Sequence, residues 1–169
     1  MKKILGLVLI LVMASFCSQS PPNDIIKLKE MVIELQNKGE LGFRNFTLCS
    51  KIMGFASYVP LDRPAVDKNG ELLIYYEPVN IYTSKKEGLY EIWFTQDMIV
   101  LRDSGEVVQE WKDLLVYHNS TRLPVMDVFA QNNITLGGQL EPGKYVFKAV
   151  LKDKLSDKTA TKTAEFEVE

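Results

Sequence analysis

Apolar and polar residues follow three successive patterns along this chain of 169 residues. After two lysines, residues 4–16 form a run that is apolar apart from Ser15. Over residues 24–38 the apolar side chains recur every three or four positions, which predicts an amphipathic helix. These side chains are Ile25, Leu28, Met31, Val32 and Leu35. From residue 43 onward the period falls to two, which is typical of half-buried strands.

The expected helix, within residues 24–39, has two interpretations. Asp24 is a suitable N-cap and Gly39 a suitable stop. The helix either packs on the following domain through its apolar stripe, or uses that stripe to meet a partner or a nearby membrane. We expect the first, because the intervening charges are of mixed sign rather than basic.

The remaining chain, residues 43–169, predicts about seven or eight strands in one domain. The segment 89–101 places Tyr90, Ile92, Phe94, Met98 and Val100 on one face, and residues 103–105 form a hairpin turn. Further strands are expected over 107–117, 125–136, 145–152 and 160–168. Because strands do not alternate with helices, the pattern argues against a parallel α/β fold and favours a two-sheet sandwich.

Aromatic side chains gather where the strand 89–101 begins. Leu89 and Trp93 lie on one face and Tyr90 on the other, so both faces are apolar there. Such a segment is either a central strand covered on its outer side, for instance by the helix, or part of an interaction surface. We take Tyr90, Trp93 and Trp111 as the candidate interaction surface.

The N-terminus predicts export. Lys2 and Lys3 precede an apolar run that is too short to span a bilayer, and this pattern is typical of a secretory signal peptide over residues 1–16. Residues 17–23 are polar and contain two prolines, as expected of a tether.

The residues Ala14-Ser15-Phe16-Cys17 resemble the lipobox of bacterial lipoproteins, although Phe16 is larger than the residue usual there. The resemblance implies acylation of Cys17 and a lipid anchor at the periplasmic membrane face or the cell surface. The alternative is ordinary cleavage after Ala14, which would yield a secreted protein. A Cys17–Cys49 disulfide would then become available, but we expect Cys49 to be a buried free thiol because it lies in an apolar run.

A second resemblance begins at Leu140-Glu141-Pro142-Gly143-Lys144-Tyr145. This segment resembles the corner of fibronectin type III domains, one residue shorter, and the corner of exported bacterial Ig-like modules. The resemblance covers residues 70–169. It implies an Ig-like antiparallel β-sandwich in which Pro142, Gly143 and Tyr145 form a structural corner, with the Tyr145 hydroxyl capping nearby backbone. It carries little information about activity.

Charge and composition limit the chemistry. The 20 basic and 22 acidic residues form no basic cluster, which argues against nucleic-acid binding and electrostatic docking on lipid. One histidine, His118, and two cysteines are too few for a closed zinc site, and no phosphate-binding glycine loop is present. We expect no metal, no cofactor and no enzymatic activity.

The sequence therefore predicts a mainly β protein: a signal peptide, one short amphipathic helix and an Ig-like sandwich. The expected function is that of a lipid-anchored envelope module that binds a protein partner or has a structural role. The alternative is a carbohydrate-binding module that uses surface aromatic rings.

Overall fold

The computed structural model describes residues 21–136, 138 and 140–169. The predicted signal peptide, Cys17 and the tether up to residue 20 lie outside these residues. The described part is mainly β, with one helix and two sheets. None of its helices is long and apolar enough to cross a bilayer.

The helix α1 (Pro21–Lys38) begins at Pro21 rather than at the predicted Asp24. Proline suits the first helical turn, where backbone N–H groups have no intrahelical partner. Asp24 consequently lies in the first turn instead of acting as the cap, and Gly39 follows the last helical residue as predicted.

Ten strands are found in the described residues, more than the seven or eight expected. They are β1 (Gly42–Gly54), β2 (Ser57–Pro60), β3 (Ala65–Val66), β4 (Glu71–Val79), β5 (Ser84–Lys86), β6 (Leu89–Arg102), β7 (Val107–Thr121), β8 (Ala130–Thr135), β9 (Gly143–Asp153) and β10 (Thr159–Val168). The short strands β3 and β5 were not predicted, because two or three residues carry no alternation to detect. The strand expected over 125–136 is confined to β8. The residues before it are irregular, but Val125 and Val128 still pack on core side chains.

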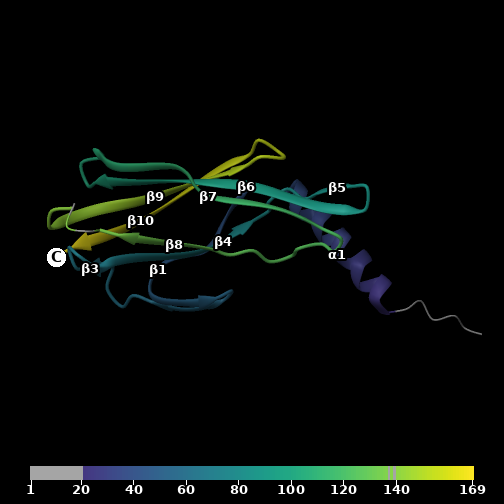
Figure 1. The fold of residues 1–169 in the computed structure, drawn as a ribbon, viewed down its shortest axis with the longest axis horizontal. Coiled ribbons are helices and arrows are strands. Elements are labelled where there is room, and N and C mark those ends of the chain that lie inside the picture. The colour runs from purple at the N-terminus through teal and green to yellow at the C-terminus, as the bar shows by residue number, and fades with distance from the viewer. Residues whose placement is uncertain (1–20, 137, 139) are drawn as a thin grey trace, which may run out of the picture.

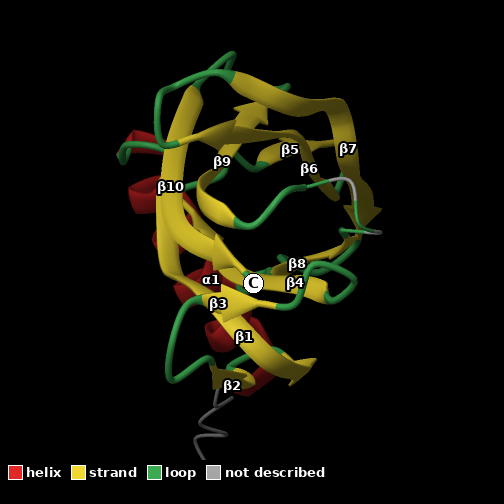
Figure 2. Cartoon of the chain, turned by 90° about the vertical axis from the view of Figure 1, so that its left-hand side faces the viewer, coloured by secondary structure: helices red, strands yellow, loops and turns green. Residues whose placement is uncertain are grey.

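The two sheets face each other as separate layers (Figure 2). The first has the order β2-β1-β4-β8, and the second has the order β3-β10-β9-β6-β5. Strand β7 pairs with the other side of β6 and forms the edge of the second sheet. All pairs are antiparallel except that of β3 with β10.

The main core lies between the sheets. It combines side chains of both layers, among them Leu72, Ile74, Met98, Val100 and Phe147. The predicted alternation holds in β9, where Tyr145, Phe147, Ala149 and Leu151 are all buried. It also holds in β6, whose even-numbered residues from Tyr90 to Val100 are buried.

Helix α1 lies at the end of the sandwich where β6 begins, and the C-terminus lies at the opposite end (Figure 1). The expectation that its apolar stripe packs on the domain is wrong. Ile25, Leu28, Met31, Val32 and Leu35 are all exposed, and the buried residue of the helix is Ile33. The outer side of β6 is not covered by α1 either, because the helix meets the buried Tyr90 instead.

Candidate functional site

Exposed apolar side chains lie along the β7 edge of the second sheet. Trp93 of β6 is 37% exposed, and Leu114 and Val116 of β7 are 46% and 61% exposed. His118 of β7 lies directly opposite Trp93. We call these four residues the β7 edge surface.

Strand β7 is a long edge strand. It spans 15 residues, and within the described residues it pairs only with β6. The far side of an edge strand presents backbone N–H and C=O groups that another extended chain can pair with. An exposed edge of this length bordered by apolar side chains is therefore a candidate docking site.

A bulge divides β7, and Leu114 lies exposed within it. Gln96 pairs with Leu115 while Met98 pairs with Trp111, so that several residues of β7 oppose the single residue Asp97. Asp113, in the bulge, has a positive φ of 47°. Bulges of this kind bend and twist a strand locally, and they commonly limit pairing at sheet edges.

The buried Asp97 holds the bulge in place. Its carboxylate accepts a hydrogen bond of 2.9 Å from the backbone N–H of Asp113 and an ion pair of 2.5 Å from Lys152. Burial raises the pKa of Asp97, but the Asp113 amide and the Lys152 ammonium outweigh burial and hold this pKa below its usual value. Asp97 is therefore ionised at neutral pH and ties β7 to β9 across β6.

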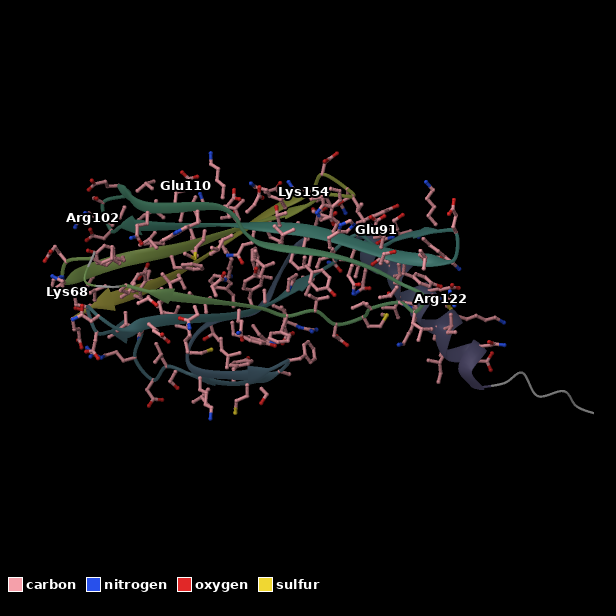
Figure 3. The ribbon with its side chains drawn as sticks, viewed as in Figure 1. Lys68, Glu91, Arg102, Glu110, Arg122 and Lys154 are labelled. Atoms are coloured by element: carbon pink, nitrogen blue, oxygen red, sulfur yellow. The ribbon has the colours of Figure 1, made fainter. Side chains whose placement is uncertain are left out.

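The Trp93 ring is partly covered by its neighbour. The indole stacks on the His118 imidazole with ring centroids 4.7 Å apart and an interplanar angle of 21°. His118 Nε2 in turn lies 2.8 Å from the Glu91 carboxylate. Glu91 points outward from the second sheet, at the end near α1 (Figure 3). Carbohydrate stacking needs an open ring face, and one face of Trp93 is occupied by His118.

The three residues predicted to form one interaction surface do not lie together. Tyr90 is 6% exposed, and its hydroxyl bonds to Glu30 of α1. Trp111 is half-buried and packs on the main core opposite Met98. Only Trp93 remains on the outer face, because odd-numbered residues of β6 point away from the core. The predicted surface is therefore wrong for Tyr90 and Trp111.

Two features are found in the segment where the sequence resemblance implies a structural corner. The Tyr145 hydroxyl donates a hydrogen bond of 2.7 Å to the backbone carbonyl of Glu141. Gly143 has a φ of 153°, a value that favours glycine. A cleft of about 270 Å³ lies beside this corner, with lining residues that include Arg63, Asp103, Lys144, Tyr145, Glu165 and Glu167. Its Arg63 is engaged by Glu169 through two hydrogen bonds of 2.5 and 2.7 Å.

A second polar cluster, on the outer side of the first sheet, was not foreseen from the sequence. Glu77 is 2% exposed and accepts hydrogen bonds from Arg44, Asn45 and the Tyr75 hydroxyl. Burial raises the pKa of Glu77, but these bonds together hold it below its usual value. Tyr75 also receives the backbone N–H of Ala56 and stacks on Tyr58 at 4.1 Å. The cluster fixes the β1–β2 hairpin against β4, which is a structural role.

The candidate chemistry is correspondingly limited. Over residues 21–136, 138 and 140–169, no three His, Cys, Asp or Glu side chains converge into a cluster that could hold a metal ion. Cys49 is a free thiol and only 2% exposed, as expected. Burial raises the pKa of this thiol, which keeps it in the unreactive protonated form at neutral pH.

Comparisons with known proteins give no family. No protein-family model and no curated protein match the chain. Among solved structures it is similar to the alkylpurine DNA glycosylase AlkC of Pseudomonas fluorescens bound to DNA with an abasic site analog, at 11% identity and a TM-score of 0.40, over 87% of this chain and 36% of that one. It is also similar to a beta-glucosidase from Listeria innocua at 10% identity and a TM-score of 0.35, over 76% and 16%. The chain thus spans about a third of the first and less than a fifth of the second.

Proposed function

We propose that this protein is an exported, lipid-anchored envelope module that acts without catalysis by binding a protein partner at the β7 edge surface. One observation carries the proposal. The 15-residue edge strand β7 lies beside the exposed side chains of Trp93, Leu114 and Val116. An extended segment of the partner would add to the second sheet beyond β7, with its backbone hydrogen-bonded to the free edge.

The bulge supports recognition of a defined segment. It interrupts the regular ladder between Trp111 and Leu115, so a continuous β-strand can pair with only one half of β7 at a time. The half from Leu115 to Thr121 adjoins Trp93 and carries the exposed Val116. We assign the partner to this half, where apolar side chains flank the free backbone.

Export and anchoring rest on the sequence of residues 1–17. Under the proposal, Cys17 is acylated and holds the sandwich at the periplasmic face of a membrane or at the cell surface. The Ig-like assignment is also part of the proposal, and it is supported by the two facing sheets and by the Tyr145 corner.

A carbohydrate-binding role receives no comparable support. Trp93 and Phe55 are the exposed aromatic rings among the described residues. Trp93 lies on β6 of the second sheet, and Phe55 lies in the β1–β2 turn of the first. A flat pair of exposed rings, the usual platform for a sugar, is not formed by them. The partner proposed is therefore a protein.

The test replaces Val116 with lysine, because a charge at an exposed edge position opposes strand addition. The full chain is expressed in its host, and co-purified proteins are quantified by mass spectrometry. The matched control is Thr163→Lys, at an exposed position of β10 in the same sheet. We expect Val116→Lys to lower recovery of one partner about tenfold, equivalent to roughly 1.4 kcal/mol, and Thr163→Lys to leave it unchanged. Equal recovery with both variants would contradict the proposal.

A further inference from the structure

Helix α1 has two apolar sides, and only one of them meets the protein. The outer side comprises Ile25, Leu28, Met31, Val32 and Leu35, which are between 43% and 69% exposed. We call these five residues the outer helix face. At 100° per residue they fall within one third of the helix circumference, so they form a continuous apolar stripe.

The inner side of α1 already packs on the sandwich and forms hydrogen bonds with it. Ile33 is 6% exposed and Ile26 is half-buried. Asn37 exchanges two hydrogen bonds with the backbone of Thr83, at 2.8 and 3.0 Å, and Glu30 forms an ion pair of 2.6 Å with Lys85. These residues lie almost diametrically opposite the outer helix face on the helical wheel, so packing on the domain leaves that face free.

The position of Cys17 places this face next to a membrane if the cysteine is acylated. Cys17 precedes Pro21, the first residue of α1, by four residues, which span at most about 14 Å when fully extended. In Figure 1, α1 crosses the end of the sandwich that lies farthest from the C-terminus. An acylated Cys17 would therefore hold α1, and not the opposite end of the sandwich, against the bilayer.

We propose that the outer helix face lies in the interfacial region of the bilayer to which Cys17 is anchored, with the axis of α1 roughly parallel to the surface. The inference rests on the lipid anchor of the proposed function. The helix would then fix the orientation of the sandwich, whereas the tether alone would leave the domain free to rotate.

The net charge of α1 and the length of its apolar stripe favour a lipid surface as the binding partner of the outer helix face. The exposed charges of α1 are Asp24, Lys27, Glu34 and Lys38, which sum to no net charge. The contact would therefore be made by burial of apolar side chains and would not require anionic lipid. A second copy of the helix is disfavoured because a stripe from residue 25 to residue 35 is shorter than two heptads, and a coiled coil needs three or four.

The experiment uses the full acylated protein, purified from host membranes and reconstituted into phosphatidylcholine vesicles. A single environment-sensitive fluorophore is attached to Leu28→Cys, and a control fluorophore is attached to Lys51→Cys on β1. Both positions are exposed, so neither variant disturbs the core, and the buried Cys49 does not react. We expect blue-shifted emission at position 28 and quenching by a lipid-borne quencher roughly fivefold stronger than at position 51.

Three other outcomes would contradict the helix proposal, and they distinguish it from the proposal of the lipid anchor. Equal, water-like emission at both positions in vesicles that retain the protein would overturn the helix proposal and leave the anchor standing. The same blue shift without vesicles would overturn it in favour of pairing between two copies. An unmodified Cys17 in the host protein, read by mass spectrometry, would refute the anchor itself and the helix proposal with it.

Discussion

Replacing Asp97 with alanine tests whether this single carboxylate holds the bulge of β7. Its two interactions, with the Asp113 amide at 2.9 Å and with Lys152 at 2.5 Å, involve a charged group. Hydrogen bonds to charged groups contribute about 1.5–3 kcal/mol each. Relief of the desolvation of the carboxylate offsets part of this sum, and Lys152, whose side chain is 31% exposed, can rehydrate. We expect a net loss of about 2–3 kcal/mol in the free energy of unfolding.

The assay is urea denaturation at pH 7, followed by tryptophan fluorescence, because Trp111 lies beside the bulge. For a domain of this size the loss corresponds to a melting temperature about 4–12 °C lower. The matched variant Asp97→Asn keeps an acceptor for the Asp113 amide but removes the charge that attracts Lys152. Its loss should be about half that of alanine, at roughly 1–1.5 kcal/mol. A loss below about 0.5 kcal/mol for alanine, the level of an ordinary surface substitution, would show that Asp97 does not hold the bulge.

Three further tests, which use four substitutions, concern other parts of the structure. Ile33→Ala should lower the free energy of unfolding by about 2 kcal/mol or more, because it empties the inner side of α1, whereas Leu28→Gln should change it by less than about 0.5 kcal/mol; equal effects in thermal denaturation would contradict the orientation of the helix. Tyr145→Phe should cost about 1 kcal/mol in urea denaturation, since only the hydroxyl bonded to Glu141 is lost, and an unchanged midpoint would show that the corner bond adds nothing. Because the folded-state pKa of Glu77 lies below its unfolded value, its contribution is present above about pH 4.5 and is lost as the pH falls through the folded pKa. Glu77→Gln should therefore lose less stability than the natural protein between about pH 5 and pH 3, and parallel pH profiles would argue against this.

The sequence was sufficient to predict the strands with clear alternation. The hairpin of β6 and β7 and the pairing of β9 with β10 follow the expected ranges closely. The signal is clearest in β6 and β9, because the even-numbered residues of β6 and every second residue of β9 are buried. The two- and three-residue strands β3 and β5 were missed, since they exist through pairing with β10 and β6. The alternation of apolar and polar residues along the chain does not show which strands pair.

The orientation of α1 shows a different limit. Periodicity correctly predicted an amphipathic helix, but it could not tell which apolar side packs on the domain. The stripe with the most apolar residues is exposed, and the side with Ile33 is buried because Glu30 and Asn37 find partners on β5 and in the loop before it. Those polar contacts depend on the tertiary structure, so sequence alone favours the wrong face.

The candidate site was predicted only in part. Trp93 is on the outer face, but Tyr90 and Trp111 are on the core side. The alternation within β6 already separates Tyr90 from Trp93, and this signal could have been used. The face of Trp111 depends on the bulge in β7, which shifts the register by an amount that the sequence does not reveal.

Photo-crosslinking in the host membrane would show directly whether a protein partner adds to the free edge of β7. A photoreactive amino acid replaces Val116 in the full chain, and the control places it at Thr163 on β10. We expect one discrete adduct at position 116, none at position 163, and loss of the adduct when Leu114→Lys is added beside the probe. Adducts of equal yield at both positions, or an adduct at 116 that persists with Leu114→Lys, would contradict the proposal.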